Sequence, residues 1–253
     1  MSALLVVARM DPRDDKIVEA AEACSFRVAR LPLLATEPGR DGARFLTWLE
    51  AAQQGAAIAW TSRRAAEALA EAALPEHEEA LAALPLFAVG EESAAPIVAR
   101  HLDVEYVLLE PSARNLGRHI AEARTSRGIR RVAFLRGDRS LPDLPDTLER
   151  AGIEVEPFEI YRTTFQDVDV DVVRSSIAAN DPVVVLYFSP SGIEALERLL
   201  PDVLASLRSR GHAVPIGDTT RRALTTRGYA SIADPGVDPF QPAALQSVKR
   251  IAP

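Results

Sequence analysis

The sequence predicts an α/β protein in which mainly parallel β-sheets are covered by helices. Short apolar runs alternate with amphipathic stretches along the whole chain, which is the pattern of successive β-α units. The composition, 47% apolar and 26% charged over 253 residues, is that of an ordinary globular protein. About ten runs have strand character, which is at the upper limit for one open twisted sheet. We therefore predict two domains.

The predicted strands are short runs rich in β-branched and other apolar residues. They cover residues 4–9, 27–34, 56–61, 86–90, 104–109, 131–136, 155–163, 183–189, 213–217 and 230–233. Helical patterns follow many of these strands, over residues 63–73, 92–100, 116–123, 146–151, 192–200 and 220–226. Strands and helices thus alternate, as parallel sheets require.

Two longer segments, residues 27–38 and 154–165, are predicted to pair as a two-stranded β ladder between the domains. Each mixes β-branched, aromatic and proline residues, and Pro32 and Pro157 suit an exposed pair of strands better than the centre of a sheet. With this pairing, residues 1–35 and 166–253 form a first, discontinuous domain. Residues 39–157 form the second.

Several function classes lack their usual signals in this sequence. The net charge of −7 gives no reason to expect a nucleic-acid partner, and no apolar run approaches the roughly 18 residues of a membrane span. One cysteine, Cys24, and four scattered histidines provide no metal-ligand spacing, so we expect no metal site. The motifs GxGxxG, GxxxxGK[ST], HExxH and GxSxG are missing. We expect a cytoplasmic protein.

Hydroxyl-bearing residues and glycines stand where predicted strands give way to helices. Ligands of open α/β sheets bind beyond the carboxyl ends of the strands, where helix N-termini offer free N–H groups to carboxylates or phosphates. Helix capping is the alternative interpretation at each position. The candidate binding residues of this kind are Thr61, Ser62, Gly90, Ser112, Ser189, Ser191, Thr219 and Thr220.

Two arginines end short apolar strands, Arg9 after the first and Arg136 after residues 131–135. A guanidinium group suits the planar, bidentate recognition of a carboxylate. We therefore add both arginines to the candidate binding residues. Solvated surface charge is the alternative interpretation.

Five segments together resemble the uroporphyrinogen-III synthase family. They are the TS pair at 61–62, VGEESA at 89–94, LRGDRSLPDLPDTLERAGIEVEPFEIYRT at 135–163, VLYFSPSGIEAL at 185–196 and IGDTTRRALTTRG at 216–228. Each alone is an ordinary junction between a strand and a helix. The series follows the order of the family and spans essentially the whole chain.

The resemblance implies two α/β domains, the first assembled from both chain ends and flavodoxin-like, with an active site in the cleft between them. It also implies a reaction in which hydroxymethylbilane is closed to uroporphyrinogen III with inversion of ring D and loss of water. The family uses no cofactor. We expect a monomer, and a transient contact with hydroxymethylbilane synthase is left open.

The resemblance assigns Tyr161, in FEIYRTT, as the acid that protonates the departing hydroxyl. Without it, an aromatic residue on an extended segment is interpreted as packing. The candidate binding residues above, together with Gly137 of the RG pair at 136–137, are assigned to substrate carboxylates and to backbone-amide contacts.

Two features depart from the family pattern, namely Arg63 and Arg64 directly after the TS pair and the negative net charge toward a substrate with eight carboxylates. The main alternative is therefore a noncatalytic protein of the same fold that binds a tetrapyrrole or a small anion. A periplasmic-type two-domain binding protein is less favoured, because no signal peptide is recognised.

Overall fold

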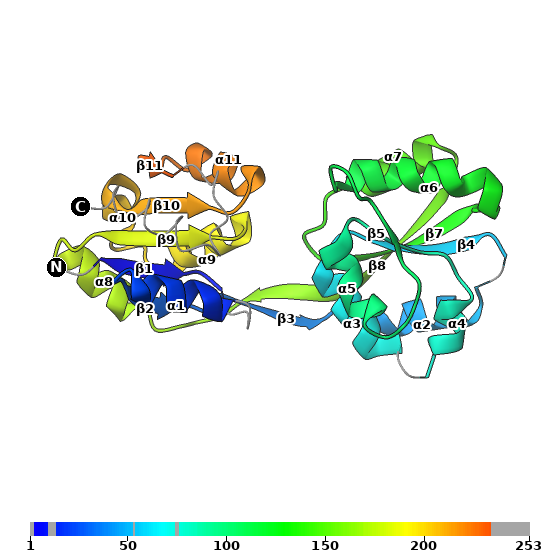
Figure 1. Ribbon diagram of the computed structural model, residues 1–253, viewed down its shortest axis with the longest axis horizontal. Helices are drawn as coiled ribbons and strands as arrows, with labels where there is room; N and C mark the ends of the chain where they lie inside the picture. Colours follow the sequence, from blue (N-terminus) through cyan, green and yellow to red (C-terminus); the bar gives the residue numbers. More distant parts are fainter. Residues whose placement is uncertain (1–2, 10–13, 53, 74–75, 234–253) are drawn as a thin grey trace. The chain divides into compact units, whose positions relative to one another are not determined.

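The computed structural model describes residues 3–9, 14–52, 54–73 and 76–233, and the chain divides into two compact units (Figure 1). The first unit consists of Met1–Ala35 and Phe165–Pro253, and the second of Thr36–Thr164. Each contains a mainly parallel sheet with helices, so the predicted α/β class is confirmed. Residues 234–253, which were assigned to the first domain, lie outside the described residues.

The first unit holds a five-stranded sheet in the order β11-β10-β9-β1-β2. Its strands are β1 (Leu4–Val7), β2 (Arg27–Arg30), β9 (Val183–Tyr187), β10 (His212–Pro215) and β11 (Ser231–Ile232). Neighbouring strands pair in parallel. Numbered within the unit, the order is 2-1-3-4-5, that of flavodoxin-like sheets, and it reverses between β1 and β9.

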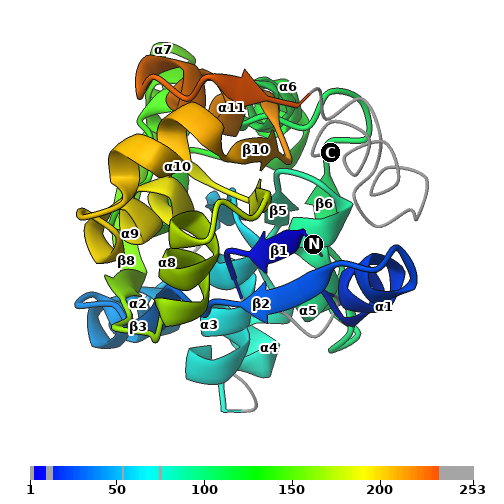
Figure 2. The same cartoon turned by 90° about the vertical axis from the view of Figure 1, so that its left-hand side faces the viewer.

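Helices cover both faces of this sheet because the strand residues alternate between two apolar cores (Figure 2). Leu5 and Val7 face α1 (Asp15–Ala23). Leu4 and Val6 belong to the core on the other face. The helices that contribute to that second core are α8 (Asp171–Ala178), α9 (Pro190–Leu199), α10 (Leu204–Arg210) and α11 (Asp218–Thr226).

A six-stranded sheet organises the second unit, in the order β3-β8-β7-β4-β5-β6. Its strands are β3 (Leu34–Pro38), β4 (Ala56–Trp60), β5 (Leu86–Ala88), β6 (Glu105–Tyr106), β7 (Arg131–Gly137) and β8 (Glu154–Phe165). The five strands from β4 to β8 pair in parallel. Their order reverses between β4 and β7, which makes this point the expected ligand crevice of a doubly wound sheet.

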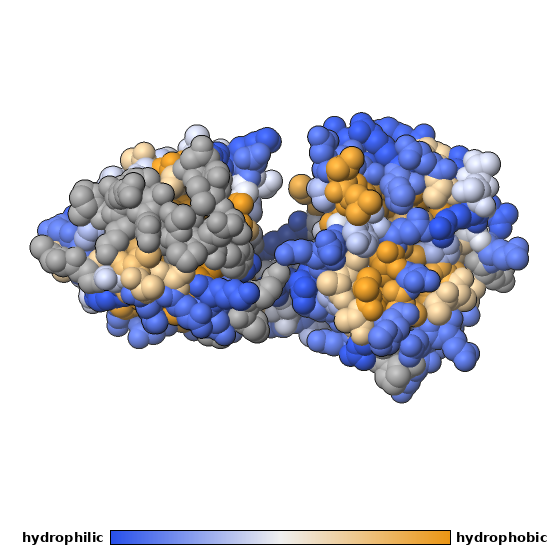
Figure 3. Space-filling model, in the orientation of Figure 1, coloured by the Kyte–Doolittle hydropathy of each residue, from blue (hydrophilic) through white to orange (hydrophobic). Residues whose placement is uncertain are grey.

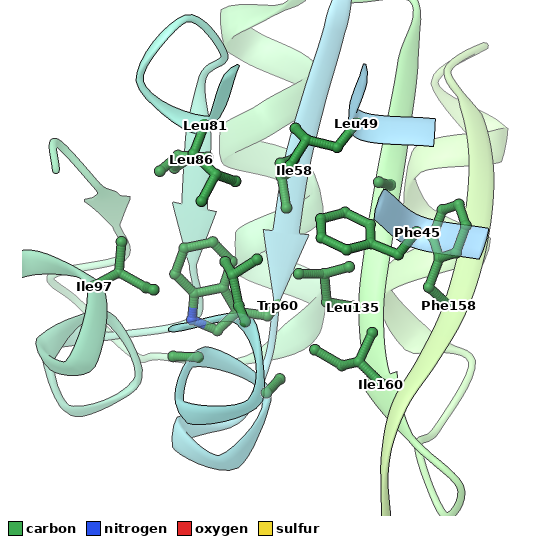
Figure 4. Packing of buried hydrophobic residues seen from close by; sticks show 14 of the residues in the cluster. Phe45, Leu49, Ile58, Trp60, Leu81, Leu86, Ile97, Leu135, Phe158 and Ile160 are labelled. Carbon is green, nitrogen blue, oxygen red and sulfur yellow. The ribbon is translucent and has the colours of Figure 1, made fainter. Parts of the chain in front are cut away.

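The two faces of the second sheet carry separate helix layers. One face packs against α6 (Ala113–Arg127) and α7 (Asp143–Arg150). The other packs against α2 (Gly42–Glu50), α3 (Arg63–Ala73), α4 (Glu78–Ala82) and α5 (Glu91–Val98). Figure 4 shows the core between the sheet and α2, α3, α4 and α5. Trp60 is fully buried there, and its indole N–H donates to the carbonyl oxygen of Ser93 at 2.7 Å.

The predicted ladder of 27–38 with 154–165 is partly wrong. Residues 27–30 form β2, which pairs in parallel with β1, and only β3 of the first segment pairs with β8. Gln166 N donates to Leu33 O at 2.9 Å, and Gly39 N donates to Ile160 O at 3.0 Å. Residue numbers thus rise along one strand as they fall along the other, so β3 and β8 are antiparallel.

β8 is also a full member of the sheet, because residues 154–161 pair with β7 and Pro157 lies opposite Phe134. β8 has 12 residues, which is long enough to pair with β7 on one side and with β3 on the other. The chain passes from one unit to the other after Ala35 and after Thr164, so both passages occur within the β3–β8 pair.

No helix in the described part of the chain is both long and apolar enough to cross a membrane.

Candidate functional site

Three of the predicted residues come together where the strand order of the second sheet reverses. The Ser62 hydroxyl lies 3.0 Å from the Tyr161 hydroxyl. Gly137 lies directly against the Tyr161 ring, because a β-carbon on Gly137 would stand 2.5 Å from Cζ of Tyr161. Ser62 follows β4, Gly137 ends β7 and Tyr161 is on β8. Both hydroxyl-bearing side chains are half-buried.

The position of Ser62 follows from the local sequence. The strand AAIAW is completely buried and stops at Trp60, and α3 begins at Arg63. Ser62 Oγ accepts a hydrogen bond from the backbone N–H of Ala65 at 3.1 Å, which is the bond of an N-cap residue. The hydroxyl is therefore fixed at the start of α3 and at the same time contacts Tyr161.

A β-bulge sets the direction of Tyr161. The register between β7 and β8 shifts after Arg136, so that Arg136 lies opposite Glu159 whereas Gly137 lies opposite Tyr161. Ile160 is the additional residue, and its side chain lies in the buried core. Because a bulge redirects the side chains that follow it, Tyr161 reaches over Gly137.

Hydrogen bonds hold the strand on both sides of Tyr161. Asp41 Oδ2 accepts from the backbone N–H of Glu159 at 2.9 Å, and Asp138 Oδ1 accepts from that of Thr163 at 3.0 Å. Burial acts to raise the pKa of Asp41, but the N–H of Glu159 and the guanidinium of Arg44 outweigh it and lower the pKa. Sequence reasoning missed Asp41 and Asp138, and the only signal for Asp138 was its place two residues after a predicted strand.

The buried Glu159 carboxylate adds a second tie. It pairs with the guanidinium of Arg162 at 2.9 Å and lies 3.5 Å from that of Arg40, with 5% of the side chain exposed. Hydrogen bonding to Glu159 raises the pKa of Arg162. The pair with Arg162 lies within β8, whereas the contact with Arg40 ties the segment around Tyr161 to the residues just before α2.

Other predicted residues of the second unit lie at neighbouring helix starts. Gly90 is the buried N-cap of α5, and Ser112 caps α6 by accepting from Asn115 N at 3.2 Å. The two starts are close, since a β-carbon on Gly90 would lie 3.2 Å from Cβ of Pro111. Thr61 is half-buried in the turn before α3. The Arg136 guanidinium donates to the carbonyl oxygen of Gly137 at 3.0 Å.

A groove of about 370 Å³ lies beside Tyr161, within the second unit between β3 and α3. Its charged lining residues are Glu37, Arg64, Glu67 and Glu71, and the Arg64 guanidinium contacts the Thr36 hydroxyl. Three carboxylates against one guanidinium make this groove unfavourable for an anionic ligand. Anionic groups are better accommodated at the helix starts.

In the first unit, the residues at the reversal of strand order are Arg9, Ser189 and Ser191. The Arg9 guanidinium lies 3.6 Å from the centre of the Phe188 ring and binds Asp14 at 2.7 Å. The Asp14 side chain is 1% exposed, so this ion pair neutralises a buried charge. Ser189 Oγ accepts from Gly192 N at 3.2 Å and lies 3.0 Å from Ser191 Oγ.

Thr219 and Thr220 both lie in the first turn of α11, but they differ in exposure. Thr219 is exposed, whereas Thr220 is buried with 3% of its surface exposed. The helical repeat explains the difference, because Thr220 and Leu224 share the inward face of α11. A ligand-binding role for the Thr220 side chain is therefore not favoured.

Comparisons with known proteins agree with this architecture. The family described as uroporphyrinogen-III synthase HemD matches residues 15–235 of the chain. A mutant uroporphyrinogen III synthase from Thermus thermophilus is 20% identical with a TM-score of 0.63, and 98% of each chain is covered. The uroporphyrinogen-III synthetase of Helicobacter pylori 26695 is 19% identical with a TM-score of 0.62, covering 98% of this chain and 100% of that one.

At such identities the two solved structures show a shared fold. None of the curated proteins compared with the chain matches it. The family match, in contrast, extends over most of the chain. The chain belongs to the uroporphyrinogen-III synthase family.

Proposed function

We propose that this protein cyclises hydroxymethylbilane to uroporphyrinogen III, with inversion of ring D and release of water, and that Tyr161 is the acid of the first step. The observation that carries the proposal is the Tyr161 hydroxyl, which lies 3.0 Å from Ser62 at the carboxyl end of the second sheet. Membership of the uroporphyrinogen-III synthase family supports the choice of substrate.

The first step breaks the C–O bond of the hydroxymethyl group on ring A. The Tyr161 O–H gives its proton to the departing hydroxyl, which leaves as water, and the electrons of the ring A pyrrole form an electrophilic exocyclic methylene. Ring D then attacks this methylene through its substituted carbon. The resulting spiro intermediate fragments and recloses in the opposite sense, and loss of one proton restores the aromatic pyrrole.

Substrate carboxylates are assigned to the helix starts. The first N–H groups of a helix have no partner within the helix, and its positive end attracts anions. The side chains and turns proposed for this role are Thr61, Gly90, Ser112, Arg136, Ser189, Ser191 and Thr219. Arg9 is omitted because Asp14 already binds it.

Apolar surface near the same strand ends supports a tetrapyrrole as the ligand. Leu108 and Leu109 follow β6, Leu141 follows β7, and all three are largely exposed. Figure 3 shows that the visible face of the second unit carries apolar patches separated by hydrophilic residues. Pyrrole rings with carboxylate side chains would match such a mixture.

Much of the catalysis is proposed to be orientation. Hydroxymethylbilane closes spontaneously to the uninverted isomer, so the protein must hold ring D in the geometry that leads to the spiro intermediate. Single changes at the carboxylate-binding positions are therefore expected to act mainly on KM.

A coupled assay tests the proposal. Hydroxymethylbilane is generated by its synthase, this protein is added without cofactor and in the presence of a chelator, and the oxidised uroporphyrin isomers I and III are separated by chromatography. We expect type III to predominate. Type I alone, formed in the presence of folded protein, would reject the enzyme; binding of the tetrapyrrole without isomer change would then identify a noncatalytic binding protein.

The same samples test two further expectations. A monomer is expected by analytical ultracentrifugation at the assay concentration. A transient contact with hydroxymethylbilane synthase would raise the yield of type III when active synthase is present, compared with the same amount of bilane added after the synthase has been removed.

A further inference from the structure

We propose that Ser62 and Gly137 are positioning residues for Tyr161. In this assignment, which rests on the proposed function, Gly137 provides the seat of the phenol ring and Ser62 donates a hydrogen bond to Tyr161 Oη. The phenol then keeps its own proton free for the departing hydroxyl. Both residues thus act on the acid, in contrast to the carboxylate binding expected from the sequence.

Space, and not backbone conformation, requires glycine at position 137. A β-carbon there would lie 2.5 Å from Cζ, 2.7 Å from Cε2 and 2.7 Å from Oη of Tyr161. Separations below 3.0 Å are repulsive contacts that a tightly packed interior relieves only by movement. Any larger residue at position 137 would therefore displace the ring together with its hydroxyl.

The hydrogen-bonding capacity of Ser62 favours donation to Tyr161. A serine hydroxyl has one proton to donate and two lone pairs. The N–H of Ala65 occupies one lone pair at 3.1 Å, and an oxygen that already accepts one bond becomes a better donor. With Tyr161 Oη at 3.0 Å, the Ser62 proton has a fixed acceptor, and the phenol proton can point elsewhere.

This arrangement has its largest effect after proton transfer. When the Tyr161 proton has left with the hydroxyl as water, Tyr161 is a phenolate, and a bond donated by Ser62 to an ionised oxygen is roughly twice as strong as one to a neutral oxygen. The positive end of α3, of which Ser62 is the cap, acts in the same direction. The phenolate then takes up the ring-carbon proton released in the last step, which regenerates the phenol.

Kinetics of matched variants test the assignment. Ser62→Ala is expected to lower kcat about tenfold with KM changed less than about twofold, and Ser62→Thr to restore most of that loss because it keeps the hydroxyl. In a Tyr161→Phe background, Ser62→Ala is expected to cost no further activity. Ser112→Ala, which removes the cap of α6 without touching Tyr161, is the control and should act on KM.

Two more variants separate this role from simple stability. Ser62→Asp keeps an N-cap side chain but cannot donate a proton, so it should melt near the unaltered protein and lose kcat as Ser62→Ala does. Gly137→Ala should lower kcat, and should have no added effect once Tyr161→Ala has removed the ring.

Each other outcome has a definite meaning. If Ser62→Ala raises KM and leaves kcat unchanged, or if its loss multiplies with that of Tyr161→Phe, Ser62 binds substrate and the assignment is overturned. The proposed function survives that result, because the unaltered protein still forms type III. If the unaltered protein forms only type I, both proposals fail together.

Discussion

The two units use the same kind of doubly wound sheet, but the side chains at the points where their strand order reverses are held in different ways. In the first unit, Arg9 lies between the buried Asp14 carboxylate and the ring of Phe188. In the second, two neutral hydroxyls, those of Ser62 and Tyr161, meet above Gly137. The point in the first unit also holds the Ser189 and Ser191 hydroxyls 3.0 Å apart, so it is the compensated ion pair of Arg9 and Asp14 that distinguishes it.

This difference shows that a residue's position at the end of a strand does not by itself determine whether it binds a ligand or stabilises the fold. A guanidinium that neutralises a buried carboxylate cannot leave it for a ligand without exposing the protein to the cost of an unpaired buried charge. The two neutral hydroxyls do not neutralise a buried charge, so they can exchange protons with a ligand. We therefore expect the loss of Arg9 to act on stability and changes at Ser62 or Tyr161 to act on turnover.

The largest effect is expected from Arg9→Ala, because it leaves the buried Asp14 without its partner. Loss of one partner of such a pair costs about 3 kcal/mol of unfolding free energy. Trp48 and Trp60, the two tryptophans of the chain, are both in the second unit, so circular dichroism should show the loss while tryptophan fluorescence changes little. Arg150→Ala, at an exposed position in the second unit, is the control. If Arg9→Ala keeps its stability but loses activity, the two units do not differ in the way described.

The next effect is expected at high pH, and again in the first unit. Burial raises the pKa of Tyr229 to about 12 and also raises the pKa of its partner Tyr187, whose hydroxyl lies 3.0 Å away. An unfolded tyrosine ionises near pH 10, so this stability is complete below about pH 10 and is lost as the pH rises toward 12. The shift of Tyr229 corresponds to about 2–3 kcal/mol.

Urea unfolding followed by circular dichroism at about pH 9 and about pH 11.5 measures this loss. Tyr229→Phe removes one of the ionising groups and should make the decline shallower. If unfolding followed by tryptophan fluorescence shows an equal loss of unfolding free energy, the second unit is as sensitive to high pH as the first, contrary to the comparison.

Tyr161→Phe is expected to lower kcat for type III formation at least about tenfold, or about 1.4 kcal/mol in barrier height, because the ring remains and the transferable proton is lost. Its melting temperature should stay close to that of the unaltered protein. The coupled isomer assay under single-turnover conditions is the measurement. Near-normal turnover would remove Tyr161 as the acid.

The smallest effect is expected from Ser189→Ala, which removes the cap of α9. Loss of a serine cap costs about 1 kcal/mol, and the change should appear in the thermal unfolding of the first unit. Ser191→Ala keeps the capping bond and serves as the matched control. If the two variants unfold at the same temperature, the bond from Gly192 N to Ser189 contributes nothing measurable.

The sequence was most informative about the central strands, for a physical reason. Strands buried on both faces of a parallel sheet are continuous apolar runs, as in Ala56–Trp60 and Val183–Tyr187. Short helices such as α2 and α10 were missed, because two turns give too few repeats of an amphipathic pattern. The pairing of β8 with β3 lies within the predicted ladder, whereas its pairing with β7 was not predicted, because strand neighbours are set by the folded sheet and not by local sequence.

The sequence predicts which residues belong to the candidate site, but it does not predict which of them contact one another. The end of a strand predicts Ser62 as a site residue, whereas Gly137 and Tyr161 follow from the family resemblance. Their meeting depends on the bulge after Arg136, which no local pattern reveals. The ion pair of Arg9 was missed for a similar reason, since the burial of Asp14 is a property of the folded unit.

A ribosome completes the second unit before the first. Residues 36–164 form one uninterrupted stretch, whereas β1 must pair with β9, which emerges about 180 positions later. The apolar residues Leu4–Val7 therefore remain without their central partner while the intervening unit is synthesised and folds. A substitution that slows the folding of the second unit would prolong this waiting period, and would favour aggregation through β1 even if the finished protein were equally stable.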